Sequence, residues 1–160
     1  MDKVYLIGFM GTGKTAIGRS LKTRYDVDEL DERFVQEHGL ISAFFEQYGE
    51  QRFRDKEIEL IRNSESQIIV TGGGIIERPE NRAFLKGSGT VVWIDTPFPI
   101  VWNRIKTDPS RPLVKSRATV EKLFRRRRPL YAESSDVRLD GTKSVRQLVK
   151  EIELILEENK

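Results

Sequence analysis

Residues 8–15 read Gly8-Phe9-Met10-Gly11-Thr12-Gly13-Lys14-Thr15 and directly follow the apolar run Val4-Tyr5-Leu6-Ile7. A strand followed by G-x-x-x-x-G-K-[ST] is the pattern of a phosphate-binding loop. The glycines let successive backbone N–H groups point at the β- and γ-phosphates of a nucleotide, and the helix that follows directs its positive end at them. Lys14 adds a positive charge, and Thr15 adds a hydroxyl that can bind Mg2+. The sequence therefore predicts binding of a nucleoside triphosphate.

The pattern around the loop predicts the fold class. Ile17, Leu21 and Tyr25 recur at every fourth residue, as expected for a helix that packs on the sheet from which the loop came. Apolar, β-rich stretches at residues 4–7, 68–71, 91–94 and 137–139 alternate with helical segments. Such alternation implies parallel strands joined by helical crossovers. We expect an α/β protein with a central, mostly parallel sheet flanked by helices.

The composition indicates one small domain, residues 1–160, without disulfides. Lys plus Arg total 28 against 25 Asp plus Glu, and a formal charge of +3 gives little support to nucleic-acid binding. The chain has no cysteine, and no apolar run approaches membrane-spanning length. Because the chain passes from Met1 into the first strand within three residues, we expect no targeting peptide and a cytoplasmic protein. We also expect a monomer, with neither nucleic acid nor membrane as partner.

Two carboxylates follow the first helix. Asp26 and Asp28 lie two residues apart, and in an extended segment that spacing places both on one face. One could reach the metal shell while the other accepts a proton from a substrate hydroxyl or hydrogen-bonds it. A solvated acidic turn explains the spacing equally well, because Glu29, Asp31 and Glu32 follow.

Glycines and an arginine form the next candidates. Thr71-Gly72-Gly73-Gly74 ends the strongest internal strand, and exposed backbone amides beside a ligand would explain three glycines there. A flexible exit from the strand is the alternative. Arg54 lies in a helix that starts near Gly49 and could hold a carboxylate with its planar guanidinium, although most helical arginines are solvated.

A candidate lid occupies approximately residues 111–118. Arg111-Pro112-Leu113 opens a polar stretch, and a mobile loop that carries an arginine can close over a triphosphate and exclude water. The arginines at 125–128 invite a nucleic-acid interpretation, but four consecutive helical residues project about 100° apart and cannot form one stripe. At most one or two of them can face any given site.

The strand at residues 91–95 ends in an aspartate, as in many ATPases that hold Mg2+ with this residue. Thr96 and Pro97 follow Asp95 where a catalytic glutamate would stand. We therefore favour a structural role for Asp95.

Six motifs in chain order closely resemble shikimate kinase, and they span nearly the whole chain. They are residues 8–15, Asp26-x-Asp28, Gly49-Glu50-x-x-Phe53-Arg54, Thr71-Gly72-Gly73-Gly74, Arg111-Pro112-Leu113 and Arg127-x-Pro129-Leu130-Tyr131. The resemblance implies a single-domain P-loop kinase with a five-stranded sheet and a mobile lid. It also implies MgATP-dependent phosphorylation of the 3-hydroxyl of shikimate, which yields shikimate 3-phosphate and ADP in the pathway to chorismate and aromatic amino acids.

The resemblance further implies a role for each matching position. The residues expected on the nucleotide are Gly11, Thr12, Gly13, Lys14, Thr15 and Ala16 at the phosphates, Arg104 against adenine, and Arg111 reaching the transferring phosphate from the lid. The residues expected on shikimate are Asp28 at its hydroxyls, Arg54 and Arg127 at its carboxylate, and Gly72, Gly73 and Gly74, of which Gly73 offers its amide. Thr15 would bind Mg2+, with Asp26 supporting it through water. Lys14, Asp28 and Arg111 would be catalytic, with Asp28 the candidate base.

Two positions depart from the family pattern. Val27 stands where the family usually has a small hydroxyl residue, and residues 142–144 lack its distinctive adenine-side residues. Other functions stay open from the residues alone: a module that senses ATP or binds nucleic acid without catalysis, or a kinase of another small hydroxylated acceptor such as gluconate. A switch GTPase is disfavoured, because neither N-K-x-D nor D-x-x-G occurs.

Overall fold

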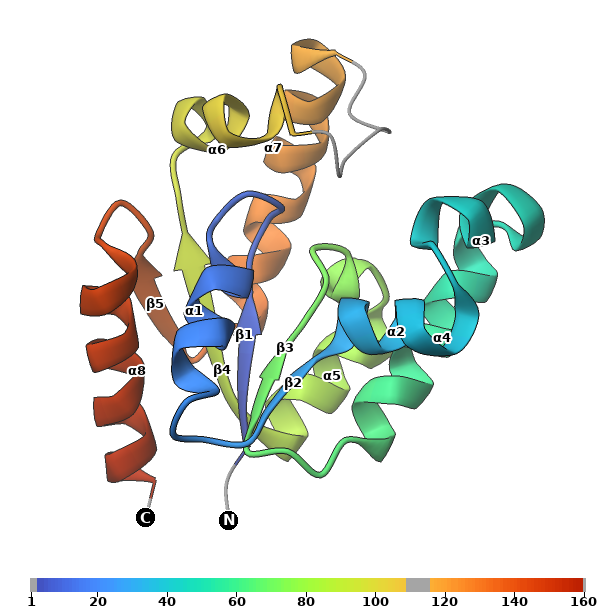
Figure 1. Cartoon of the computed structure of the whole chain (residues 1–160). Helices are drawn as coiled ribbons and strands as arrows, with labels where there is room; N and C mark the ends of the chain where they lie inside the picture. Colours follow the sequence, from blue (N-terminus) through green and yellow to red (C-terminus); the bar gives the residue numbers. More distant parts are fainter. Residues whose placement is uncertain (1–2, 109–115, 160) are drawn as a thin grey trace.

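The computed structural model describes residues 3–108 and 116–159, which form a five-stranded sheet with helices on both faces (Figure 1). The strands are β1 (Lys3–Ile7), β2 (Val27–Glu29), β3 (Ile68–Val70), β4 (Gly89–Asp95) and β5 (Val137–Asp140). They lie in the order β2-β3-β1-β4-β5, and every pairing is parallel. The predicted α/β class and the parallel five-stranded sheet are confirmed.

Helices fill the connections between the strands. They are α1 (Lys14–Leu21), α2 (Leu30–His38), α3 (Ile41–Tyr48), α4 (Glu50–Asn63), the 3-10 turn η1 (Ile75–Glu77), α5 (Pro79–Ser88), α6 (Phe98–Ile105), α7 (Arg117–Ser134) and α8 (Val145–Glu158). Residues 111–115 of the predicted lid, including Arg111, lie outside the described part of the chain. Arg117 already belongs to α7, and Ser116 caps this helix by accepting a hydrogen bond from the backbone N–H of Thr119. The helix therefore begins inside the segment that the sequence assigned to the lid.

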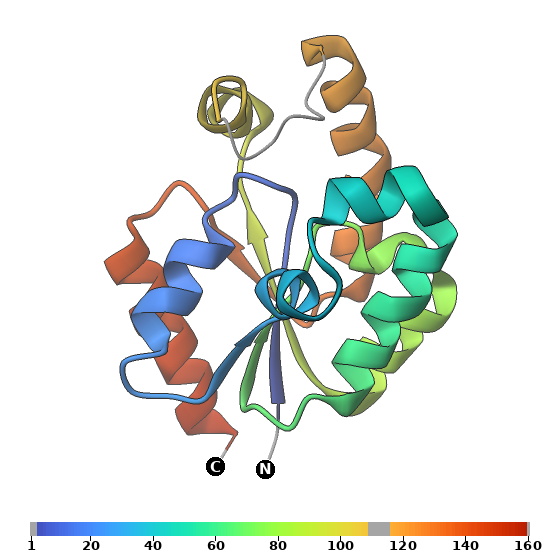
Figure 2. The same cartoon turned by 45° about the vertical axis from the view of Figure 1, so that its right-hand side comes forward.

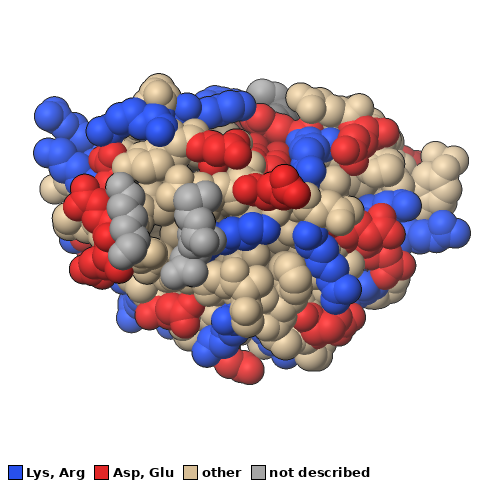
Figure 3. Space-filling view, turned by 90° about the horizontal axis from the view of Figure 1, so that it is seen from below, with Lys and Arg blue, Asp and Glu red and all other residues tan. Residues whose placement is uncertain are grey.

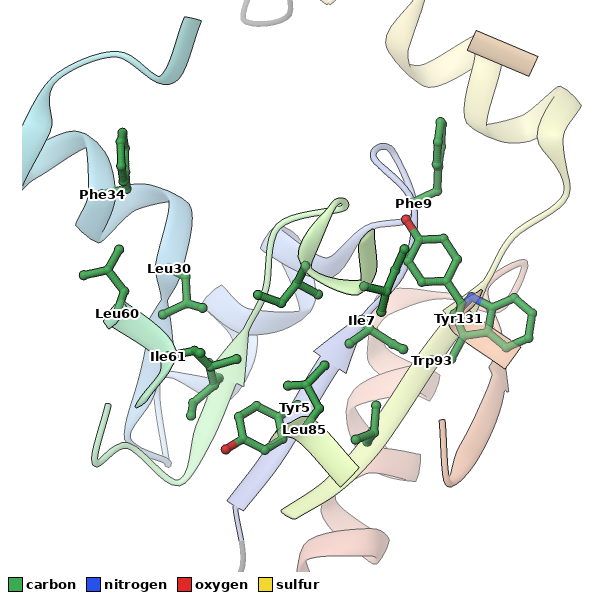
Figure 4. Packing of buried hydrophobic residues seen from close by; sticks show 14 of the residues in the cluster. Tyr5, Ile7, Phe9, Leu30, Phe34, Leu60, Ile61, Leu85, Trp93 and Tyr131 are labelled. Carbon is green, nitrogen blue, oxygen red and sulfur yellow. The ribbon is translucent and has the colours of Figure 1, made fainter. Parts of the chain in front are cut away.

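The sheet separates two hydrophobic cores, because successive strand residues point to opposite faces. In β1, Val4 and Leu6 pack toward α1 and α8, whereas Tyr5 and Ile7 pack on the other face. Figure 1 shows α1 and α8 together on one side of the sheet, and Figure 4 shows the core on the opposite side around Tyr5, Ile7 and Trp93. This alternation decides which side chains of each strand can reach a ligand.

Helices α2, α3 and α4 pack on one another beside the sheet (Figure 2). The ring of Phe34 in α2 meets the rings of Phe44 and Phe53 edge to face, at centroid distances of 5.1 and 4.9 Å. Such contacts add to the free energy gained by burying the rings. Because Phe53 directly precedes Arg54, this aromatic cluster fixes the part of α4 that carries the arginine.

None of the helices within residues 3–108 and 116–159 is long and apolar enough to cross a bilayer. On the face in Figure 3, basic and acidic side chains are interspersed rather than gathered into one basic patch.

Candidate active site

The predicted phosphate loop connects β1 to α1 at the carboxyl edge of the sheet. Gly13 stands before α1 with a φ of 95°, a left-handed conformation that favours glycine, and open space lies where a side chain would start. The buried ammonium of Lys14 donates hydrogen bonds to the carbonyl oxygens of Gly8 and Phe9. Thr12 Oγ1 donates to the carbonyl of Phe9 at 2.9 Å. The loop is thus held in shape by its own side chains at the amino end of α1.

Arg104, predicted to lie against the nucleotide, is close to the phosphate loop in the structure. Arg104 Nη1 donates to the carbonyl oxygen of Gly11 at 3.0 Å, which joins α6 to the phosphate loop. Beside it lies a cavity of about 280 Å3, which residues of the loop, α1 and the β5–α8 connection line. These residues are Thr12, Gly13, Ala16, Ile17, Arg104, Gly141, Lys143, Val145 and Leu148. Gly141 and Lys143 thus line this cavity, close to residues 142–144, where the sequence lacks the distinctive adenine-side residues of the family.

The glycine run after β3 brings both predicted arginines together. A Cβ on Gly74 would overlap the guanidinium of Arg54, so only a residue without a side chain fits against it. A Cβ on Gly73 would lie 3.4 Å from Arg127 Nη1 and 3.4 Å from the backbone nitrogen of Met10. Arg54 and Arg127 are 5% and 7% exposed. Two buried guanidinium groups therefore meet one short backbone segment that also touches the phosphate loop.

Buried acids balance these arginines. Glu57 Oε1 accepts from Arg54 Nη1 at 2.9 Å, and Glu57 Oε2 has no hydrogen-bond partner among the residues that the structure describes. A Cβ on Gly72 would lie 2.9 Å from Asp31 Oδ1 and 3.1 Å from Glu57 Oε2, so both carboxylates border the glycine run. Burial raises the pKa of Glu57 to about 7, against the opposing effect of Arg54.

A further acid, Glu29, lies beside α1. Its Oε2 would be 3.7 Å from a Cβ on Gly18, one turn beyond Lys14. Burial, followed by the charges of Asp31 and Glu32, raises the pKa of Glu29 to about 7, and the charge of Lys14 opposes this shift. Glu29 and Asp31 therefore approach the predicted nucleotide and substrate sites from the end of β2.

The predictions for Asp26 and Asp28 are wrong in their placement. Asp26 is exposed before the start of β2, at the end of the strand remote from the phosphate loop. Asp28 points to the face opposite α1, where its Oδ2 accepts from Ser64 Oγ at 2.5 Å and pairs with Arg33 Nη2 at 3.0 Å. The physical reason is strand alternation: side chains one position later point toward α1. Asp28 therefore ties β2 to α4 rather than facing the site.

Glu29, Asp31 and Glu57 border the predicted site, and the sequence did not single them out as candidates. Glu29 and Asp31 have the same two-residue spacing as Asp26 and Asp28 but stand at the carboxyl end of the strand, where ligands of parallel sheets bind. The spacing alone could not distinguish the two pairs, because they differ only in their position relative to the end of β2. Glu57 follows Arg54 by three residues in α4, a helical spacing that brings side chains into contact.

Asp95 has the structural role that its sequence context favoured. Its Oδ2 pairs with Arg128 Nη2 at 3.0 Å and with Arg138 Nη2 at 2.5 Å. These side chains line a second cavity of about 500 Å3 on the α7 side of the sheet. Although this cavity is larger than the one beside Arg104, both of its arginines already pair with Asp95, and the phosphate loop does not line it. We therefore place the nucleotide in the smaller cavity.

Comparison with known proteins agrees with this geometry. The family model described as "Shikimate kinase" matches residues 10–157. The shikimate kinase of Persephonella marina is 39% identical over 160 residues, covering 95% of this chain and 97% of that protein. The shikimate kinase of Geobacter sulfurreducens is 40% identical over 166 residues, covering 98% and 91%.

Solved structures give the same result. Shikimate kinase from Acinetobacter baumannii in complex with shikimate has a TM-score of 0.89 at 31% identity, covering 100% of this chain and 95% of that one. Shikimate kinase from Aquifex aeolicus has a TM-score of 0.83 at 36% identity, covering 98% and 97%. A deoxyadenosine kinase from M. mycoides, at 14% identity and a TM-score of 0.66, shares the fold alone. Sequence and structure together show that this chain belongs to the shikimate kinase family.

Proposed function

We propose that this protein transfers the γ-phosphoryl group of ATP to the 3-hydroxyl of shikimate, which yields shikimate 3-phosphate and ADP. The observation that carries the proposal is the convergence of Arg54 and Arg127 on Gly73 and Gly74, next to Met10 of the phosphate loop. Two buried guanidinium groups suit the carboxylate of the acceptor, and the loop beside them suits the phosphates of the donor. Kinship with shikimate kinases favours this acceptor over gluconate.

The nucleotide would bind along the first turn of α1 and the cavity beside Arg104. The backbone N–H groups of residues 11–16 would hold the phosphates, with the dipole of α1 directed at them. Lys14 would exchange its contacts with the loop carbonyls for the β- and γ-phosphates. Arg104 and Lys143 would border the base, since both line the cavity.

Asp31 takes the acceptor role that the sequence assigned to Asp28. Its carboxylate borders Gly72, beside the glycine run that faces both arginines. From there it would orient the hydroxyl groups of shikimate and accept the proton of the 3-hydroxyl as the phosphoryl group is transferred. Glu57 would hold Arg54 in place, because its carboxylate pairs with Nη1 of this arginine.

The residues at the loop fit a Mg2+ ion. Thr15 is exposed on the first turn of α1, and Glu29 places a carboxylate on the same side of the sheet, so both offer the oxygen ligands that Mg2+ prefers. Within the described residues no group of three or more His, Asp or Glu side chains forms a metal site by itself. When bound, the ion would neutralise charge on the β- and γ-phosphates. We therefore assign its protein ligands to Thr15 and, directly or through water, Glu29.

Arg111 stays a proposal for the lid residue that neutralises the transferring phosphate, because it lies outside the described residues. A monomeric state and a cytoplasmic location likewise stay proposals, based on the even charge balance and the chain's composition.

Lys14→Ala provides the central test of the proposed reaction. Loss of this charge should lower turnover by at least about 10^2, the range measured for a preorganised electrostatic contact to a transition state. ADP release should be measured with shikimate, gluconate and nucleoside monophosphates as acceptors, using the unaltered protein as reference. Release that depends on gluconate but not on shikimate would contradict the proposed acceptor, and near-normal turnover of Lys14→Ala would contradict the proposed phosphate site.

A further inference from the structure

Glu77 contacts Arg127, one of the two arginines proposed to bind the carboxylate of the acceptor. It stands at the end of η1, three residues beyond Gly74, and its side chain is 17% exposed. Glu77 Oε2 accepts a hydrogen bond from Arg127 Nε at 3.0 Å and pairs with Arg126 Nη2. A single carboxylate oxygen therefore links the turn after the glycine run to two consecutive arginines of α7.

The contact uses one edge of the Arg127 guanidinium and leaves another edge facing the site. Nε meets Glu77, whereas Nη1 is the atom nearest to Gly73, at 3.4 Å from a Cβ placed there. A guanidinium is planar and presents its N–H groups in a fixed fork. Fixing Nε therefore also fixes the direction in which the Nη groups point.

The two arginines that Glu77 holds differ in their surroundings. The side chain of Arg127 is 9% exposed, and that of Arg126 is 63% exposed. Exposed ion pairs contribute little, because water competes for both partners and salt screens them. The contact with the buried Arg127 is therefore the one that can fix the orientation of a guanidinium group.

Glu77 is ionised at neutral pH. Burial opposes its ionisation, but the charges and hydrogen bonds of Arg127 and Arg126 hold the pKa of Glu77 below its usual value. An ionised acceptor forms shorter and stronger hydrogen bonds with a guanidinium than a neutral one. The link between η1 and α7 is therefore present under the conditions of catalysis.

We propose that Glu77 is a positioning residue for the acceptor: by binding the Nε edge of Arg127, it aims the Nη edge at the carboxylate of shikimate beside Gly73. This inference rests on the proposed function, in which Arg127 binds the acceptor carboxylate. It adds a residue to the acceptor site that does not itself touch the substrate.

The test compares Glu77→Ala with Glu77→Gln. Alanine removes the acceptor of the Nε hydrogen bond, and the KM for shikimate should rise at least fivefold while the KM for ATP stays within twofold. Glutamine keeps an acceptor oxygen of the same reach, and it should restore the KM for shikimate to within about twofold of the unaltered protein. An unchanged KM in Glu77→Ala, or equal losses in both variants, would overturn the proposal.

Two control variants come from α7, the helix that carries Arg127. Glu121→Ala removes a carboxylate that pairs with exposed Arg125, and it should leave both KM values unchanged. Arg126→Ala removes the exposed partner of Glu77, and it should also leave the KM for shikimate within twofold. If Arg126→Ala reproduced the loss in Glu77→Ala, Glu77 would act through Arg126 and the proposal would be overturned.

A double-mutant cycle separates this inference from the proposed function. In an Arg127→Ala background, Glu77→Ala should change kcat/KM for shikimate by less than twofold, because its partner is gone. Equal factors in both backgrounds would overturn the positioning role alone. If Arg127→Ala by itself left the KM for shikimate unchanged, the assignment of Arg127 to the acceptor carboxylate would fail first, and the inference about Glu77 would fail with it.

Discussion

Asp28 and Glu29 are neighbours in β2, yet their carboxylates lie on opposite faces of the sheet. Asp28 bonds Ser64 and pairs with Arg33, whereas Glu29 approaches α1 near Gly18. The alternation of a single strand therefore assigns one acid to holding the fold and the next to the nucleotide side.

Asp28→Asn and Asp31→Asn should have opposite consequences. Asp28→Asn replaces a carboxylate, whose side chain is 10% exposed, with a neutral amide and so weakens its charge-assisted contact with Arg33. The free energy of unfolding should fall by up to about 1.5–3 kcal/mol with little change in turnover. Asp31→Asn should instead lower turnover by about 10^2 or more, if general-base catalysis contributes its typical share. Denaturant unfolding and single-turnover rates on both variants check this. A fall in turnover confined to Asp28→Asn would restore the assignment made from the sequence.

The pH dependence of Mg2+ use should report on Glu29. Its pKa of about 7 means that the carboxylate becomes protonated as the pH falls through 7, and a protonated carboxyl is a poor ligand. The apparent affinity for Mg2+ should therefore fall about tenfold per pH unit well below 7. Glu29→Gln should bind Mg2+ more weakly at pH 8 and show no such dependence. Equal slopes in both proteins would assign the titration to another group.

The raised pKa of Glu29 also affects the free energy of unfolding. Low pH weakens Mg2+ binding by Glu29 but favours the folded state. Because the pKa of Glu29 is raised on folding, the folded state binds the proton more tightly than the unfolded state. Glu29 therefore favours the fold below about pH 4.5, and this contribution is lost as the pH rises to about 7. Unfolding of the unaltered protein and of Glu29→Gln, measured from pH 4 to pH 8 without Mg2+, should show the difference.

The pair formed by Arg54 and Glu57 allows binding to be separated from folding. Arg54→Met leaves Glu57 buried without its cation, and breaking a buried pair from one side costs about 3–5 kcal/mol of stability. Adding Glu57→Gln should recover most of that stability. The KM for shikimate should stay at least tenfold raised in both, because a lost charge-assisted contact is worth about 1.5–3 kcal/mol. Recovery of the KM together with stability would show that Arg54 does not bind the acceptor.

Gly74→Ala should damage acceptor binding through Arg54. The new Cβ would overlap the guanidinium, so the arginine must leave its position. The KM for shikimate should rise at least fivefold, while the KM for ATP stays unchanged. Gly87→Ala is the matched control: it lies in α5 with nothing within 4 Å of its Cβ position, and it should raise stability by about 0.4–1 kcal/mol. Equal acceptor KM values in both variants would contradict this role of Gly74.

Much of the fold could be predicted from the sequence, and so could the phosphate loop and the glycine run, because they depend on local patterns. The loop at residues 8–15 and the alternation of apolar stretches are such patterns, and so is the glycine run at residues 72–74. The acid pair could not be assigned by the same means, since the pattern Asp-x-Asp at residues 26–28 recurs as Glu-x-Asp at residues 29–31. Only the position of the strand end, which tertiary pairing with β3 determines, separates them.

The role proposed for Glu77 could not be predicted either, because it depends on a contact between distant segments. Glu77 and Arg127 are 50 residues apart, and nothing in either segment marks them as partners. Their contact depends on how α7 crosses η1, which follows from burial of α7 residues such as Val120 and Tyr131 in the core. A motif can identify Arg127 as a ligand of the acceptor, but it cannot identify the acid that directs it.

The pairing of Arg54 and Arg127 with internal acids lowers the net positive charge that these two arginines present to an acceptor. Arg54 is matched by Glu57 and Arg127 by Glu77, so an approaching anion meets little net attraction beyond the Debye length of about 8 Å. Capture of the acceptor then depends on shape and hydrogen-bond geometry at contact, and its association rate should change little with ionic strength. Selection among small anions should therefore depend on contacts with the hydroxyl groups of the acceptor rather than on its charge.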